Sequence, residues 1–266
     1  MKNKIIYSLF AILIVACFVF YAILSKDKKY SGVTYDIEYF SDTLFTEKDL
    51  AQYAHLSVIG KPFDSVNLAA LETQIETFPY ISNADVINNR GNLIIKATQE
   101  KVIARIFNNK DEQFLLAESG KLVPKAKNKA GRMLVISGNI HERYADNYFV
   151  YAKDTVHKNQ PNIKYSPLHL AWKIAFFIEQ SPFFKAQISQ IYVNESRDLE
   201  LVPVVGEHII LFGNVVMNEN IDEVIEERFD NLKYIYSEGF KITGWKYKSI
   251  NLKYGREIIP CVRNSD

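Results

Sequence analysis

The sequence is poor in the residues that build metal sites and redox sites. Only two of its 266 residues are cysteines, Cys17 and Cys261, and five are histidines. No Cys-x-x-Cys motif occurs, and no two histidines have the His-x₃-His spacing of a helical zinc site. The sequence therefore predicts neither a metal nor any other cofactor.

Clustered glycines and net charge are also lacking. The 11 glycines are scattered singly, so no phosphate-binding loop is present, and no serine has the G-x-S-x-G frame of a hydrolase. Thirty-two basic residues nearly balance 31 acidic ones, and the net charge of +1 does not favour a nucleic-acid partner. Because no catalytic constellation is found, we expect a binding protein and not an enzyme.

Long apolar runs are absent with one exception. Ile5 to Leu24 are twenty consecutive residues without a charge. A helix rises about 1.5 Å per residue, so this run could span a bilayer core of roughly 30 Å. We therefore predict a tail over residues 1–4, a transmembrane helix over 5–24 and a polar linker over 25–31. Cys17 would then lie in the membrane, where it could not pair with Cys261.

Two alternatives for this run stay open. A cleaved signal peptide would have an apolar region of about 7–15 residues and a small-residue cleavage site, which this run lacks. Residues 14–17, Ile-Val-Ala-Cys, look like a lipoprotein cleavage box, although seven more apolar residues follow Cys17. The flanking charges do not decide the orientation, because lysines lie on both sides of the run: Lys2, Lys4, Lys26, Lys28 and Lys29.

Residues 32–101 predict a small two-layer domain. Alternation from Val33 to Tyr39 indicates a half-buried strand, and Thr46 and Asn67 can cap two helices. Four residues form an apolar stripe on the second helix: Leu68, Leu71, Ile75 and Phe78. Two more strands follow at 81–88 and 93–98. The order strand, helix, helix, strand, strand predicts two helices on one face of a three-stranded sheet.

Residues 102–266 predict a second domain, rich in strands and with two helices. Its predicted strands are short runs separated by turn residues: 102–107, 113–117, 121–123, 133–136, 187–193, 199–205, 208–212, 247–254 and 257–262. The helices are predicted from Pro167 to about residue 180 and from Ile221 to Tyr236, with Gly239 just past the end of the second. Residues 140–166 are predicted to be a loop. The predicted fold class is α+β.

Several phrases of the sequence resemble a known family. FPYISNADVINNRGNLIIKATQEK at 78–101, with the element order before it, resembles a POTRA domain. VIARIF at 102–107, LAESGKLVP at 116–124 and MLVISGNI at 133–140 are similar to the FtsQ/DivIB family of bacterial division proteins. GWKYKSINLKYGREII at 244–259 resembles the Bacteroidetes branch of that family.

The resemblance implies a non-enzymatic cell-division scaffold. A protein of this kind has a cytoplasmic N-terminus, one inner-membrane helix, and a POTRA domain and β-rich domain in the periplasm. It recruits FtsB/FtsL-like partners by strand addition at the end of the β-rich domain. Other divisome membrane proteins would bind through the POTRA domain.

The predicted partner-binding surface is the last strand, 257–262. It follows a tight turn, and Pro260 is tolerated mainly at sheet edges or bulges. Tyr254 matches a tyrosine of the family's terminal strand motif. The predicted partner-binding residues are Tyr254, Glu257, Ile258, Ile259 and Val262. The alternative is an ordinary edge blunted by charged residues and proline.

Two other functions remain as alternatives. A membrane-anchored or lipid-anchored POTRA protein of envelope biogenesis is one. The outer-membrane members of that class need a C-terminal barrel of many alternating strands, which this sequence does not supply. A membrane-anchored periplasmic enzyme is the other, and it would need convergent polar groups in a pocket.

Overall fold

The computed structural model describes residues 12–20, 28–40, 43–125, 131–146, 148–150, 166–215, 219–243, 247–254 and 261–263. The chain divides into two compact units, Met1–Gln99 and Glu100–Asp266. The division lies close to the predicted domain boundary between residues 101 and 102.

The predicted transmembrane helix needs correction. Residues 12–20 of the apolar run are helical, and the rest of the run lies outside the described residues. Within the described ranges, no helix has both the length and the apolarity needed to cross a membrane. This finding contradicts the transmembrane part of the predicted fold class. It also contradicts the predicted inner-membrane, single-pass localisation with periplasmic domains.

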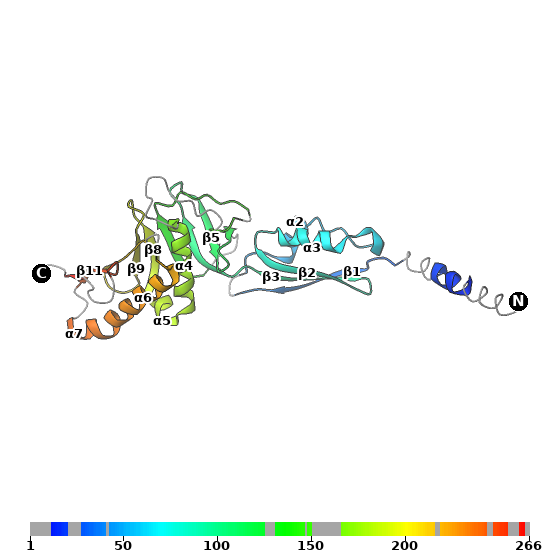
Figure 1. Ribbon diagram of the computed structural model, residues 1–266. Coiled ribbons are helices and arrows are strands. Elements are labelled where there is room, and N and C mark those ends of the chain that lie inside the picture. The colour runs from blue at the N-terminus through cyan, green and yellow to red at the C-terminus, as the bar shows by residue number, and fades with distance from the viewer. Residues whose placement is uncertain are drawn as a thin grey trace. The chain divides into compact units, whose positions relative to one another are not determined.

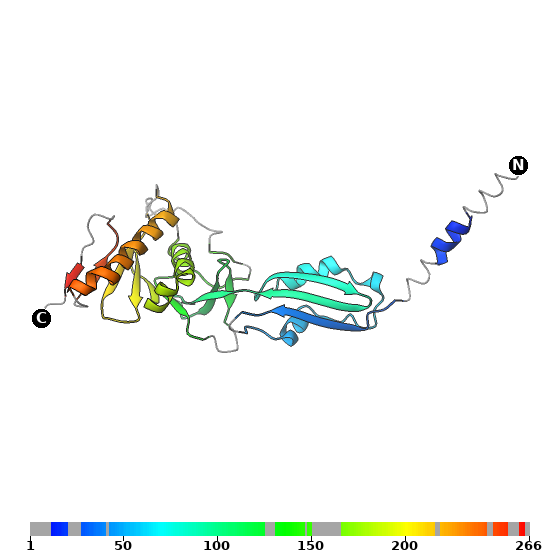
Figure 2. The same ribbon diagram turned by 90° about the horizontal axis from the view of Figure 1, so that it is seen from below.

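The first unit has the predicted order of strands and helices. Its elements are β1 (Gly32–Glu38), α2 (Glu47–Tyr53), a 3₁₀ turn η1 (Phe63–Ser65), α3 (Leu68–Glu76), β2 (Ile81–Asn89) and β3 (Asn92–Gln99). The strand order is β1-β3-β2, with β1 parallel and β2 antiparallel to β3. Figure 1 shows α2 and α3 on one face of this sheet, and Figure 2 shows its three strands side by side.

Local chemistry determines where these helices begin. Thr46 and Asp49 form a reciprocal capping box at the start of α2, and the Asn67 side chain accepts a hydrogen bond from the Ala70 amide at the start of α3. The apolar stripe of α3 faces the sheet. Its members Leu71, Ile75 and Phe78 are buried, as are the facing strand residues Leu93, Ile95 and Val86. Leu68 is only half-buried and Phe78 lies two residues beyond the end of α3, so the predicted helical stripe is confirmed at Leu71 and Ile75.

The second unit contains a nine-stranded sheet. Its strands are β4 (Val102–Phe107), β5 (Gln113–Ala117), β6 (Leu122–Pro124), β7 (Leu134–Gly138), β8 (Ile188–Val193), β9 (Leu199–Pro203), β10 (Ile209–Gly213), β11 (Tyr247–Asn251) and β12 (Cys261–Arg263). The strand order is β12-β11-β10-β9-β8-β7-β4-β5-β6. Each predicted strand of this region has a counterpart in the sheet, although the last is described only over its end.

Helices pack on this sheet through one continuous apolar core. They are α4 (Pro167–Gln180), α5 (Pro182–Gln187), α6 (Ile221–Tyr234) and α7 (Phe240–Thr243), with a π-helical turn η2 (Ile235–Gly239) between the last two. The apolar stripes of α4 and α6 are buried in this core: Leu168, Ala171, Ala175 and Ile178, then Ile225, Phe229 and Leu232. They meet strand residues such as Ile191, Leu201 and Ile250.

The prediction of two helices in this region is wrong. Ser181-Pro182 ends α4 as expected, but it also starts α5, because the Ser181 side chain caps the Phe184 amide and Pro182 suits the first turn. Gly239 does not end α6. Its φ is not positive, and the chain continues through η2 into α7.

Candidate partner-binding edge

The candidate site is the edge of the nine-stranded sheet formed by β12. Its partner β11 lies antiparallel to it, with Tyr247 opposite Arg263, Ser249 opposite Val262 and Ile250 opposite Cys261. β12 stands at one end of the strand order. Among the described ranges, no strand pairs with its outer side.

The opposite edge of the same sheet is covered. β6 stands at that end of the order, and residues 148–150 lie along it. The Leu122 amide donates to the Tyr148 carbonyl at 2.8 Å, and the Val150 amide donates to the Gly120 carbonyl at 3.0 Å. Because buried or paired edges cannot accept another strand, the two ends of this sheet differ in their capacity for strand addition.

The predicted site residues fall partly on this edge. Val262 lies in β12. Tyr254 follows β11 and its side chain is 59% exposed. Glu257, Ile258 and Ile259 lie outside the described residues, so the structure does not place them.

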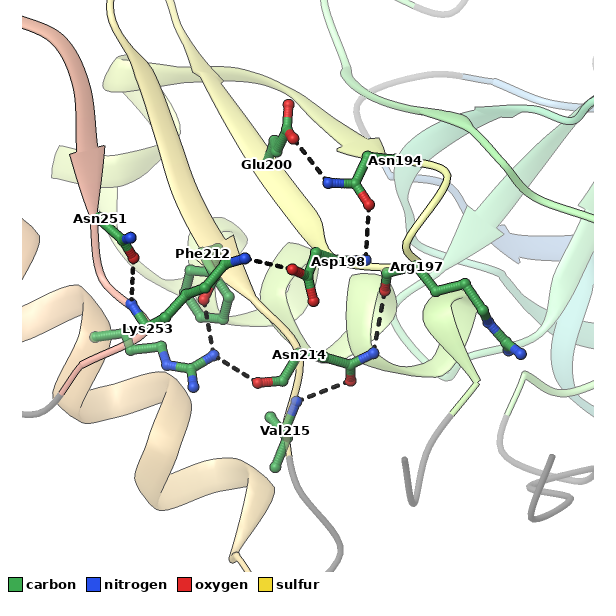
Figure 3. A network of polar contacts seen from close by, with 10 residues as sticks. Asn194, Arg197, Asp198, Glu200, Phe212, Asn214, Val215, Asn251 and Lys253 are labelled. Carbon is green, nitrogen blue, oxygen red and sulfur yellow. Dashed lines mark hydrogen bonds and ion pairs between the residues drawn. The ribbon is translucent and has the colours of Figure 1, made fainter. Parts of the chain in front are cut away.

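A set of polar contacts holds the segment that leaves β11. We call it the strand-end network, and its members are Asn194, Arg197, Asp198, Glu200, Phe212, Gly213, Asn214, Arg228, Asn251 and Lys253. Figure 3 labels all of its members except Gly213 and Arg228, and they lie around the start of β9 and the ends of β10 and β11. The Lys253 ammonium forms an ion pair with Asp198, and the Lys253 amide donates to Asn251 Oδ1 at 3.0 Å. The ion pair therefore ties the residue before Tyr254 to the turn between β8 and β9.

Gly213 makes room for this ion pair. Its φ is +82°, and a Cβ built on it would lie 2.7 Å from Cγ of Lys253. The aliphatic part of Lys253 thus crosses directly over the glycine. The pairing of β9 with β10 is also irregular between Leu211 and Gly213. A side chain at position 213 would displace Lys253 or the backbone beneath it.

Arg228 ties the end of β10 to α6. Its Nη1 donates to the carbonyls of Phe212 at 2.8 Å and Asn214 at 2.9 Å. The residue is 8% exposed, and burial lowers the pKa of its guanidinium. The two carbonyls therefore satisfy part of the hydrogen-bonding capacity of the buried guanidinium. They do so without a buried carboxylate partner.

The turn between β8 and β9 completes the network. Asn194 Oδ1 accepts from the Asp198 amide at 3.0 Å, while Asn194 Nδ2 donates to Glu200 at 2.9 Å. Asn214 Nδ2 donates to the Arg197 carbonyl at 3.1 Å, which joins this turn to the end of β10. These hydrogen bonds therefore hold the turn that carries Asp198, the ion-pair partner of Lys253.

A buried histidine, His208, directly precedes β10. His208 is 2% exposed, and its Nε2 lies 2.9 Å from the Tyr236 hydroxyl in η2. Its ring also contacts Phe240 with a centroid separation of 5.6 Å. Burial lowers the pKa of His208 and raises the pKa of Tyr236, so both side chains are held neutral.

A family model described as FtsQ/DivIB, C-terminal related, matches residues 101–261, which is more than half of the chain. The chain belongs to the FtsQ/DivIB C-terminal related family. A search of curated proteins found no match.

FtsQ/DivIB membership gives the chain a role in cell division, in a family of non-enzymatic proteins that interact with other division proteins. The family match covers the second unit from β4 to the first residue of β12, and it includes Tyr254 and residues 257–259. The first unit lies outside it. The resemblance of residues 32–101 to a POTRA domain, and of the chain to the Bacteroidetes branch, therefore stay predictions.

Sequence reasoning missed most of the strand-end network of this FtsQ/DivIB-related chain. The residues Asn194–Asp198 were recognised as a turn, but nothing in them pointed to Lys253, which lies 55 positions away. Gly213 directly after an apolar strand was the one available signal, because glycine at a strand end often marks a bulge or close approach.

Proposed function

We propose that the protein is a division scaffold that captures a partner by strand addition at β12. The partner contributes an extended segment that pairs with the outer side of Cys261–Arg263. Backbone hydrogen bonds supply the affinity, and the side chains of alternate residues supply the specificity. Tyr254, Glu257, Ile258, Ile259 and Val262 are the proposed contact residues.

One observation carries this proposal. The two ends of the nine-stranded sheet are unequal: residues 148–150 cover β6, whereas β12 stands at its end of the strand order with β11 as its described neighbour. Strand addition needs an edge of this second kind. The strand-end network supports the same interpretation, because it fixes the backbone immediately before Tyr254.

We further propose that the partner is an FtsB/FtsL-like pair, as the resemblance implies. The first unit would contact other division proteins. These assignments derive from family membership in a group whose members interact with division proteins. Two docking units in one chain would raise the effective concentration of partners bound to each, which is how a scaffold without catalytic activity acts.

The proposal is tested by capture of a purified FtsB/FtsL-like pair on the full chain. Deletion of residues 261–266 removes β12 and should abolish capture. Deletion of residues 264–266 alone keeps β12 and serves as the matched control, which should capture the pair as the intact chain does. Circular dichroism on all three proteins checks that the fold survives.

Two results would oppose the proposal. Full capture by a folded 261–266 deletion would move the docking surface elsewhere. Equal loss in both deletions would show that the terminal residues matter and that β12 does not.

A further inference from the structure

We infer that the outer edge of β1 in the first unit is a second strand-addition site, for an extended segment that alternates apolar residues with lysine or arginine. The site is separate from β12 and does not rest on the function proposed there. The residues just before β1 already form backbone hydrogen bonds on this side. Those bonds show in which direction the backbone N–H and C=O groups of the edge point.

The residues just before β1 show which way the backbone faces. The Ser31 amide donates to the Gly91 carbonyl at 2.8 Å, toward β3. The Tyr30 amide instead donates to the Lys61 carbonyl at 3.0 Å, and the Tyr30 carbonyl accepts from the Gly60 amide at 2.8 Å. Residues 60–63 thus lie on the side away from β3.

Successive amides along an extended strand point in opposite directions. Continuing the alternation from Tyr30 and Ser31 gives Gly32, Thr34, Asp36 and Glu38 outward-facing backbone groups. Among the residues that the structure describes, the hydrogen bonds of Gly32–Glu38 run to β3 and to side chains on its open face, such as Asn92 to Thr34. The segment 60–63 stops short of this stretch, so a partner strand would continue where it ends.

On the other edge of the same sheet, a side chain occupies one backbone donor. The Val86 amide of β2 points outward and donates to Glu72 Oε2 of α3 at 3.1 Å. A carboxylate on an edge amide occupies a donor that an added strand would need. This contact disfavours strand addition at the middle of β2, and β1 is the edge that we assign to the partner.

The side chains along β1 specify the partner. Val33, Tyr35 and Ile37 face the helices and are only partly buried, and no strand among the described residues lies on the outer side of β1. On the open face, Asp36 and Glu38 are exposed. An added strand would place every second residue beside the apolar row and the others beside the two carboxylates, so an apolar-basic alternation fits both rows.

The test uses the full chain and a short synthetic peptide of alternating valine and lysine. The peptide is N-methylated along one backbone edge to prevent self-association. Hydrogen exchange should slow over residues 32–38 when the peptide is added. Replacing Asp36 and Glu38 by lysine should weaken binding about tenfold, from the loss and reversal of two cross-strand charge pairs. A valine-glutamate peptide should then bind that variant better than the valine-lysine peptide does.

Asp85→Lys is the matched control. Asp85 lies on the same open face, in β2, where it stands opposite Lys96 of β3. It therefore carries the same charge as Asp36 and Glu38 but does not lie on the β1 edge. Its replacement should leave peptide affinity unchanged. If the lysine variant unfolds, a double variant with neutral side chains, Asp36→Asn with Glu38→Gln, takes its place. This variant should weaken peptide binding by a smaller factor. Slowed exchange over β2 instead of β1, an unchanged affinity in the Asp36/Glu38 variants, or an equal loss with Asp85→Lys would each overturn the inference.

Discussion

Single residues in the second unit hold strand ends through buried polar contacts. Arg228 satisfies two carbonyls at the end of β10, and His208 meets the Tyr236 hydroxyl at its start. Both side chains cost free energy to bury, and their hydrogen bonds offset that cost only while their charge states are kept. For Arg228 this charge is permanent in practice, whereas His208 is titratable and burial lowers its pKa.

His208 makes stability depend on pH. Burial lowers its pKa in the folded state, while the unfolded chain has a pKa of about 6.5. Below that pH the unfolded state binds a proton that the folded state resists, so stability is retained above about pH 6.5 and falls as the pH drops below it. Urea unfolding at about pH 7.5 and about pH 5.5 should show this loss.

Comparison of one variant with the unmodified chain isolates the contribution of His208. His208→Gln should lose less stability between the two pH values than the unmodified chain. A pH dependence unchanged by His208→Gln would show that the histidine is not held neutral.

At the scale of elements, the order of strands and helices follows from local signals in the sequence. Period-two alternation located β1, and the capping residues Thr46, Asn67 and Ser166 stand at the starts of helices. Contacts between distant elements were not predictable in this way. Glu72 of α3 accepts a hydrogen bond from an edge amide of β2, and Lys253 forms an ion pair with Asp198. No pattern in the sequence links the two partners of either contact.

The end of β10 and the segment after β11 depend on Gly213. In Gly213→Ala, the new Cβ would meet the Lys253 side chain at 2.7 Å, in a backbone conformation that alanine disfavours. We expect a loss of about 1–3 kcal/mol in the free energy of unfolding. Hydrogen exchange should also quicken at the Leu252 amide, which donates to the Leu211 carbonyl.

Gly60→Ala is the comparison variant for this effect. Gly60 has a similar φ of +81°, but a Cβ there meets nothing within 4 Å. It should therefore show the backbone strain without faster exchange at Leu252. Faster exchange in both variants would trace the effect to strain and not to displacement of Lys253.

At the scale of the whole molecule, the sequence correctly predicted the FtsQ/DivIB relationship, whereas its prediction for the N-terminal segment was wrong. The length of the apolar run was read as a membrane span, yet the described residues contain no helix suited to that role. The candidate site was predictable in position, since the last strand lies at a sheet edge. The cover on β6 comes from residues 148–150, which the sequence placed in a loop without a partner.

The central claim, docking of a partner strand on β12, is tested most directly by hydrogen exchange on the full chain with and without the FtsB/FtsL-like pair. Bound partner should slow exchange of the outward-facing amides of Cys261–Arg263 and leave Leu122–Pro124 unchanged. Slowed exchange confined to the helices α4 and α6 or to the first unit, with β12 exchanging as in the free protein, would contradict the claim.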